Sequence, residues 1–138
     1  MVAGVRIACD VGTARIGMAR CDAGGVLAVP LDAVPAGPDA CGAVAAIAAS
    51  FDAVEIIVGL PLRLDGTEGP AASHARAWAD DLAAHVAMPV RLVDERLTTV
   101  EAQRGLHAAG RTTRTSRSVI DSASAVILLQ SVLDGGKP

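Results

Sequence analysis

The stretch that decides the fold is Val90–Thr99, with the sequence VRLVDERLTT. Three of its first four residues are apolar, and they lead into the carboxylates Asp94 and Glu95, an arginine and two threonines. This pattern is typical of a buried strand that ends in an acidic pair just before a helix. Catalytic and metal-binding groups of open α/β sheets gather at that end of a strand. A solvated acidic turn has the same pattern, and the stretch alone does not distinguish the two interpretations.

The residues around this stretch form short apolar runs that alternate with segments of helical periodicity. We expect strands over residues 5–9, 15–21, 26–34, 54–58 and 90–93, and helices over residues 40–50, 70–86, 98–110 and 118–133. Turn residues join the first three strands, which predicts an antiparallel meander whose third strand is interrupted at Pro30. The apolar run 54–58 is typical of a strand buried in a parallel sheet. This order predicts an α/β fold, with a mixed five-stranded sheet of an antiparallel meander plus parallel strands, flanked by helices.

Length and composition indicate one globular domain. The chain has 138 residues, of which 51% are apolar, so residues 1–138 can form one domain with a substantial core but not two domains. The three cysteines, Cys9, Cys21 and Cys41, form no CxxC pair, which favours free thiols in a reducing compartment. No apolar run approaches the roughly 18 residues of a membrane span, and Asp10 interrupts the N-terminal apolar run too early for a signal peptide. We therefore expect a cytoplasmic protein.

Charge is distributed unevenly along the chain. The net charge of −3 argues against a protein that binds nucleic acid without discrimination. Six of the eleven arginines nevertheless lie between Arg91 and Arg117, and the segment from Arg104 to Ile120 contains no acidic residue. This basic segment either contacts phosphates or is a solvated loop. Aromatic residues make up only 1% of the chain, so recognition of a duplex or junction by shape is favoured over the stacking of single-stranded bases.

Three acidic positions share one property, because each lies at the end of an expected element. Asp10 closes the first strand, Asp94 and Glu95 close the fifth, and Asp121 lies in the first turn of the last helix, where apolar spacing directs its side chain inward. If the first and fifth strands are neighbours, these acids converge. Converging carboxylates repel each other, and a divalent cation such as Mg²⁺ relieves that repulsion. Two such ions can activate water and stabilise the leaving oxygen of a phosphodiester.

Each acid could also have a purely structural role. Asp10 could cap a hairpin turn, Asp94 could be a turn residue, and Asp121 could close a capping box that begins at Ser118. Side chains alternate across a strand, so at most one of Asp94 and Glu95 faces the cluster, and periodicity does not choose between them. The DVGT sequence that starts at Asp10 also occurs in actin-like ATPases and sugar kinases, but 138 residues leave no room for the second domain that closes over ATP.

Together these residues resemble the YqgF family, also called RuvX, of bacterial Holliday-junction resolvases and pre-16S rRNA nucleases. The matching blocks are Asp10–Gly17 (DVGTARIG), Val58–Leu62 (VGLPL), Asp65–Pro70 (DGTEGP), Asp94–Thr99 (DERLTT) with Glu101–Gln103 (EAQ), and Ile120–Leu128 (IDSASAVIL). They cover nearly the whole chain in the order of the family. The chain departs mildly from the family's pattern at Arg63, Ser122 and Ser124.

This resemblance implies an RNase H-like fold and a nuclease that depends on Mg²⁺ or Mn²⁺. It implies that Asp10, Glu95 and Asp121 are the catalytic acids and hold two ions, and it favours Glu95 over Asp94 for that role. Arg15 matches the basic residue of the family's first hairpin. The basic residues expected to contact phosphates are Arg15, Arg96, Arg104, Arg111, Arg114 and Arg117.

We therefore expect a metal-dependent endonuclease on structured nucleic acid, acting in the cytoplasm as a monomer or homodimer. The favoured substrate is the 5′ end of the precursor of 16S rRNA, in ribosome biogenesis. A four-way DNA junction in recombination and repair is the alternative. Two other classes compete with an endonuclease. A non-catalytic RNA-binding module on the same fold would bind RNA equally well without Asp10, and an ATP-dependent phosphotransferase would bind a nucleotide.

Overall fold

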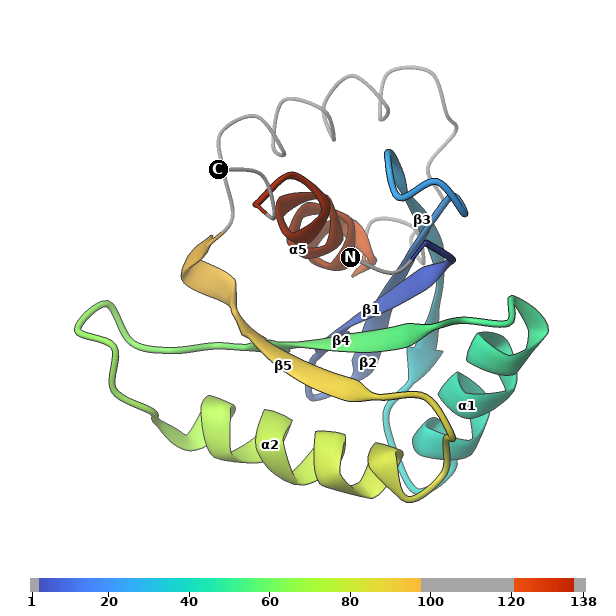
Figure 1. The fold of residues 1–138 in the computed structure, drawn as a ribbon. Coiled ribbons are helices and arrows are strands. Elements are labelled where there is room, and N and C mark those ends of the chain that lie inside the picture. The colour runs from blue at the N-terminus through green and yellow to red at the C-terminus, as the bar shows by residue number, and fades with distance from the viewer. Residues whose placement is uncertain (1–2, 98–120, 136–138) are drawn as a thin grey trace.

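A mixed five-stranded sheet forms the centre of the fold, with the strands in the order β3-β2-β1-β4-β5 (Figure 1). The computed structural model describes residues 3–97 and 121–135. The strands are β1 Arg6–Val11, β2 Arg15–Cys21, β3 Ala28–Pro35, β4 Glu55–Leu60 and β5 Val90–Asp94. β1, β2 and β3 pair antiparallel, whereas β4 pairs parallel with both β1 and β5. The predicted sheet, an antiparallel meander plus parallel strands, is therefore confirmed.

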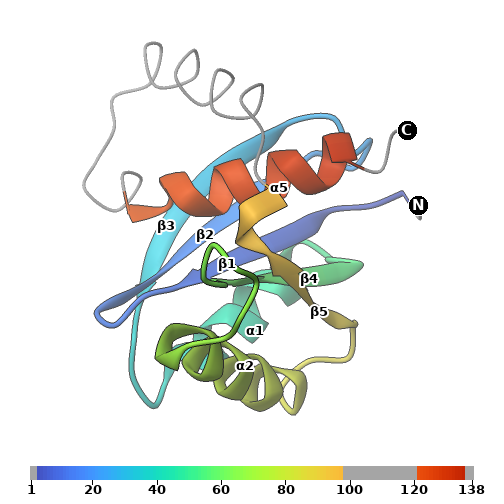
Figure 2. The same cartoon turned by 90° about the vertical axis from the view of Figure 1, so that its left-hand side faces the viewer.

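Helices cover both faces of this sheet (Figures 1 and 2). They are α1 Ala40–Ser50, α2 Pro70–Ala83 and α5 Ala123–Gly135, and a short 3₁₀ helix, η1 Glu95–Leu97, follows β5 directly. Side chains alternate along β1, so the strand contributes to two cores. Ile7 and Cys9 join the apolar cluster under α1 and α2, while Ala8 joins the cluster under α5. The sheet thus has one face toward α1 and α2 and an opposite face toward α5.

One expectation about the third strand is wrong, and one condition for the convergence of the acids is not met. Pro30 does not interrupt the third strand but pairs with Ala19 inside it. β3 is an edge strand of the sheet, where a residue without an N–H is tolerated. The first and fifth strands are not neighbours, because β4 lies between them. Any contact between Asp10 and the acids of β5 must therefore cross β4.

The last helix, α5, begins at Ala123, with Asp121 and Ser122 directly before it. Several expectations concern residues outside the described part of the chain and remain predictions. They are the helix over residues 98–110, the capping box expected at Ser118, and the basic residues Arg104, Arg111, Arg114 and Arg117.

The three cysteines, Cys9, Cys21 and Cys41, are all buried free thiols, as expected from their number and spacing. Burial, together with the charges of Asp10 and Cys41, raises the pKa of Cys9 far above its ordinary value. This thiol therefore stays protonated and is no nucleophile. Within residues 3–97 and 121–135, the helices are too short or too polar to span a bilayer.

Candidate active site

Asp10 lies near the end of β1 on the face of the sheet that α5 covers. Ala8 packs under α5, and side chains two residues apart in a strand share a face. On the neighbouring strand β2, Asp10 pairs with Gly17. Residues directly opposite each other in an antiparallel pair project to the same side. The surface beside the Asp10 carboxylate is therefore the bare backbone of a glycine.

Glu95, the first residue of η1, reaches Asp10 across β4. Val93 packs under α5, so Glu95 continues the same face of β5. Gly59 pairs with Val93 and occupies the intervening position on β4. The Glu95 carboxyl group lies in the space that a Cβ at Gly59 would fill. Because Gly59 has no side chain, Glu95 can cross β4 and form a hydrogen bond with Asp10.

The pairing of two carboxyl groups changes the acidity of Glu95. Burial, then the charge of Asp10 and the hydrogen bond between them, and last the charge of Asp94, raise the pKa of Glu95 to about 7. Two carboxylates this close repel each other when both are ionised. Buried beside Asp10, Glu95 therefore binds its proton more tightly than an ordinary glutamate does.

Asp121 approaches the same face from the far end of the sequence, over Gly17. A Cβ added to Gly17 would lie 2.5 Å from the backbone oxygen of Asp121 and 3.2 Å from Cα of Ser122. Such a close approach of two backbones needs glycine. Since Gly17 pairs with Asp10, this contact brings Asp121 to the strand beside Asp10. Asp10, Glu95 and Asp121 thus come to one face and one end of the sheet from three separate segments.

Ser122 fixes the position of Asp121 through a buried hydroxyl. Its Oγ accepts a hydrogen bond from the Met18 N–H, at 3.0 Å, and donates one to the Leu31 carbonyl, at 2.7 Å. The pairing of β2 with β3 shifts at this point, because Ile16 pairs with Val34 but Met18 pairs with Leu31. One extra residue of β3 bulges there, which interrupts the ladder of backbone hydrogen bonds. The Ser122 hydroxyl bridges the interruption and attaches the start of α5 to two strands.

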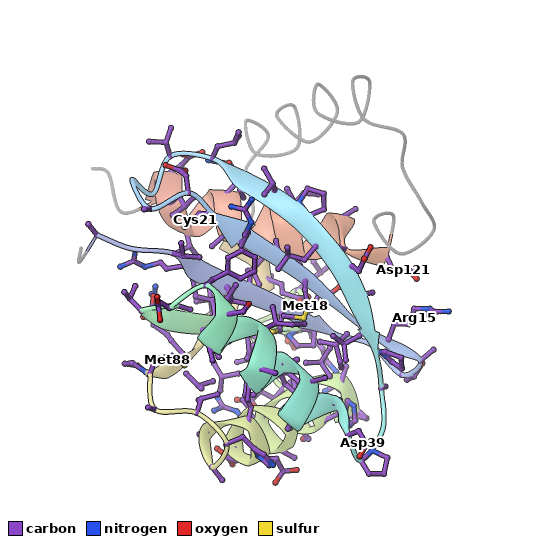
Figure 3. All side chains as sticks on the ribbon, turned by 90° about the vertical axis from the view of Figure 1, so that its right-hand side faces the viewer. Arg15, Met18, Cys21, Asp39, Met88 and Asp121 are labelled. Carbon is purple, nitrogen blue, oxygen red and sulfur yellow. The ribbon has the colours of Figure 1, made fainter. Side chains whose placement is uncertain are left out.

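Arg15 and Asp121 form an ion pair at the edge of this site (Figure 3). Arg15 Nε lies 3.1 Å from Asp121 Oδ2, and the two side chains are 46% and 32% exposed. The Oδ2 atom itself is buried and has no hydrogen-bond partner among the described residues, so the contact with Arg15 is a charge pair without hydrogen-bond geometry. The guanidinium therefore offsets the negative charge of Asp121 but donates no hydrogen bond to its Oδ2 atom.

Asp94 projects away from the other acids. It interacts instead with Arg96, whose backbone N–H and guanidinium both donate to its carboxylate, the guanidinium at 2.7 to 3.1 Å. These bonds hold the pKa of Asp94 below its ordinary value. The structure thus separates the two neighbouring acids as alternation required, with Glu95 beside Asp10 and Asp94 beside Arg96. Arg96 Nη1 also donates to the Leu64 carbonyl, at 3.3 Å, so this arginine ties η1 to the loop after β4.

The three acids offer only carboxylate oxygens, the ligand type that Mg²⁺ and Mn²⁺ prefer. In the part of the chain that the structure describes, no group of three or more Asp, Glu, His or Cys side chains is gathered closely enough to hold a metal ion as it stands. The acids nevertheless already favour positive charge beside them, since the pKa of Glu95 is raised and a guanidinium lies at Asp121. The donor set and the unsatisfied Oδ2 of Asp121 therefore fit a divalent cation, on condition that Arg15 moves aside.

The sequence singled out the acids but not the residues that let them meet. Gly17 and Gly59 make room for Asp121 and Glu95, and Ser122 anchors the start of α5. A glycine inside an apolar strand is itself a signal of close approach, so Gly59 could have been found. Ser122 could not, because its role depends on a bulge in a strand about 90 residues earlier.

Known proteins share this chain's sequence over nearly its whole length. Residues 4–135 match the family model described as "RuvX: Holliday junction resolvase". A protein of Kineococcus radiotolerans named "Putative pre-16S rRNA nuclease" is 53% identical over 135 residues, which cover 95% of this chain and 72% of the relative. A protein of the same name from Streptomyces coelicolor is 49% identical over 134 residues, which cover 95% of this chain and 80% of the relative.

Solved structures share the fold. RuvC of T. thermophilus, solved in complex with a Holliday junction substrate, superposes with a TM-score of 0.61 at 15% sequence identity, over 97% of each chain. A second T. thermophilus RuvC structure has a TM-score of 0.55 at 13% identity. The likeness confirms the RNase H-like fold that the sequence resemblance implied.

Proposed function

The chain belongs to the RuvX family, and from that premise we propose that it is a metal-dependent endonuclease that hydrolyses phosphodiester bonds in structured nucleic acid. One observation carries the proposal. Asp10 and Glu95 meet across Gly59, on the face of the sheet where Asp121 arrives over Gly17. Acids converging from three segments on one face are costly to hold together and have no use in a merely structural domain.

In this proposal Asp10, Glu95 and Asp121 are the catalytic acids, and they hold Mg²⁺ or Mn²⁺, as two ions. The ions supply positive charge that stabilises the transition state of phosphodiester cleavage and activates a water molecule. The residues of the chain do the rest. Gly59 leaves Glu95 free to reach over β4, Ser122 holds Asp121 in place, and Arg15 offsets the charge of Asp121 in the metal-free protein.

Arginines supply the contacts with the phosphate backbone. Arg15 pairs with Asp121 and is 46% exposed, so its guanidinium can turn from Asp121 to a phosphate. Arg96 presents a 40% exposed side chain beside Glu95, although Asp94 and Leu64 already engage it. Arg104, Arg111, Arg114 and Arg117 lie outside the described residues and complete the proposed set.

For the substrate, we propose the 5′ end of the precursor of 16S rRNA. The names of the relatives from K. radiotolerans and S. coelicolor support this choice. A four-way DNA junction is the second candidate, favoured by the description of the family and by the shared fold of RuvC. The scarcity of aromatic residues suits recognition of either substrate by shape. We further propose that residues 1–138 act as one domain in the cytoplasm, as a monomer or homodimer.

The test is cleavage of both substrates by the wild-type protein and by Asp10→Asn, with Mg²⁺, with Mn²⁺ and in excess EDTA. Asp52→Asn is the matched control, because Asp52 is exposed at the turn before β4, at the opposite end of that strand. Asp10→Asn and EDTA should abolish cleavage, and Asp52→Asn should leave it unchanged. Cleavage that persists in EDTA would overturn the metal mechanism. RNA binding without cleavage by any variant would favour the non-catalytic module.

A further inference from the structure

Leu64 is the most exposed large apolar side chain in the described residues, at 97% exposure. It lies in the loop between β4 and α2, residues 61–69. A single exposed leucine on a flexible loop needs no explanation. This loop, however, is held by its own hydrogen bonds, so the exposure of Leu64 is imposed by the structure.

The loop is a closed hairpin with Leu64 near its tip. Leu62 and Glu68 form a β-bridge across its base. Inside it, the Arg63 N–H donates to the Thr67 carbonyl at 2.9 Å, and the Gly66 N–H donates to the Arg63 carbonyl at 2.8 Å. Gly66 has a φ of +89°, which glycine adopts without strain.

Side-chain hydrogen bonds also hold the loop, both within it and to α2. Asp65 Oδ1 accepts hydrogen bonds from the Thr67 N–H and hydroxyl, at 2.9 and 2.7 Å. Glu68 accepts two hydrogen bonds from the Arg76 guanidinium on α2, both at 2.7 Å. A bidentate pair of this kind fixes orientation as well as distance. The tip therefore has little freedom to fold Leu64 back onto the protein.

Arg96 connects the loop to the acids. Its guanidinium donates to the Leu64 carbonyl at 3.3 Å and lies against Gly66. Arg96 directly follows Glu95 in η1, and the loop lies beside η1 in Figure 2. The position of Leu64 is thus set relative to the acid that would bind metal.

Arg63 places a cation directly before the tip, whereas the acid on the other side, Asp65, is engaged by Thr67 within the loop. Arg63 precedes Leu64, is exposed, and forms no ion pair with any described residue. Proteins that open or bend nucleic acid insert an apolar side chain between bases while cations beside it hold the backbone. The chain has only two aromatic residues to stack on bases, Phe51 and Trp78, and both belong to the core under α1 and α2.

We propose that Leu64 is a wedge that inserts against a base where a duplex opens, next to the phosphodiester held at the acidic site. The inference rests on the proposed nuclease function and adds how the protein selects its cleavage point. Arg63 holds the strand on one side of the wedge, and Arg96 keeps the wedge in register with Glu95. The apolar contact with Leu64 partly replaces the stacking contact that the opened base loses.

The test follows base unstacking separately from cleavage. Two probes carry 2-aminopurine, which brightens when it is unstacked: a four-way DNA junction with the label at the branch point, and an RNA hairpin with the label at the base of its stem. Asp10→Asn serves as the binding background, so that the probes stay intact. In that background we compare Leu64, Leu64→Ser and Leu64→Met. Val26→Ser is the control, because Val26 is 71% exposed in the turn between β2 and β3, away from the acids.

Binding of one probe by the Asp10→Asn protein should raise its fluorescence, and the brighter probe identifies RNA or DNA as the partner. Leu64→Ser should abolish the rise, Leu64→Met should keep it, and Val26→Ser should not affect it. With Asp10 intact, Leu64→Ser should cleave the opened substrate on the order of 10-fold to 100-fold more slowly, since misplacement of the scissile bond has that effect. Stability should be unchanged, because the side chain makes no buried contact.

Failure of the wedge and failure of the nuclease give different results. A fluorescence rise that survives Leu64→Ser, or no rise with either probe, overturns the wedge. A rise that depends on Leu64, in a protein that cleaves neither substrate with any metal, supports the wedge and overturns the nuclease function alone.

Discussion

Glu95 lies directly over Gly59, so that a Cβ at position 59 would overlap the carboxyl group of Glu95. Gly59→Ala should therefore displace Glu95 from Asp10 while leaving the fold intact, because the atoms that must move belong to a flexible side chain. We expect cleavage to fall on the order of 10-fold to 100-fold, as for other small displacements of catalytic groups. Mn²⁺ affinity, measured by calorimetry, should fall as well.

Gly42→Ala is the matched control for this substitution. Gly42 lies inside α1, and a Cβ there would have no atom within 4 Å. Replacing a glycine in a helix by alanine stabilises the helix by roughly 0.5–1 kcal/mol. Gly42→Ala should therefore cleave normally and unfold at a slightly higher temperature. Normal metal affinity in Gly59→Ala would show that Glu95 does not need its place over Gly59.

The pKa of Glu95 makes the stability of the metal-free protein depend on pH. Its pKa is about 7 in the folded protein, against 4.5 ordinarily, so the folded state holds the proton more tightly than the unfolded chain does. The stabilisation from this proton is complete below pH 4.5 and is lost as the pH rises through about 7. We expect the free energy of unfolding to fall by on the order of 1–3 kcal/mol across that window. Urea unfolding in EDTA at several pH values measures it.

Glu95→Gln should remove this part of the pH dependence, because an amide does not titrate. The comparison is the difference in slope between wild type and variant, since other groups titrate in both. Glu68→Gln is the control, because Glu68 is exposed and its Arg76 partner lowers its pKa. Equal slopes for wild type and Glu95→Gln would mean that the pKa of Glu95 is not raised in the folded protein.

The candidate acidic positions could be found from sequence because they are local features, although only the family resemblance favoured Glu95 over Asp94. Asp10, Glu95 and Asp121 each lie at the end of a strand or the start of a helix, and chain order alone locates such ends. How they meet could not be predicted, because strand order is a long-range property. The sequence analysis made convergence conditional on adjacent first and fifth strands, but β4 lies between these strands, and Gly59 is what allows contact.

Pro30 and Ser122 show the same limit in the packing of the sheet. A proline predicts that a strand is interrupted unless the strand lies at the edge of its sheet. That β3 lies at the edge, paired with β2 alone, follows only from the strand order. In the sequence, Ser122 is only a small departure from the family's pattern. The structure shows that the bulge in β3 leaves the Met18 N–H and the Leu31 carbonyl to be hydrogen-bonded by the Ser122 hydroxyl. Patterns along the chain thus identify candidate chemistry, whereas pairings between distant segments decide its geometry.

Ser122→Ala should destabilise the protein and impair cleavage. The substitution leaves the Met18 N–H and the Leu31 carbonyl without their shared partner in a fully buried place. An unsatisfied buried group costs roughly 1–3 kcal/mol. Urea unfolding should show a loss of that size. Ser124→Ala, at an exposed position of α5, should stay within about 0.5 kcal/mol of wild type. If Ser122→Ala is as stable as wild type, the hydroxyl does not anchor the start of α5.

Arg15→Gln should have opposite effects on the two ligands of the site. In the structure the guanidinium competes with a cation for Asp121, at 3.1 Å from its Oδ2. An exposed ion pair is worth about 0.2–1 kcal/mol, so its removal should tighten Mn²⁺ binding by up to about 5-fold. If Arg15 then contacts a phosphate, the same substitution should weaken binding to a duplex and reduce the salt dependence of log K by about 0.9.

Arg91→Gln is the control, because Arg91 forms a comparable pair with Glu55, at the opposite end of β4 and β5. A variant with weaker Mn²⁺ binding would show that Arg15 supports the metal site, and an unchanged salt dependence would remove Arg15 from the phosphate contacts.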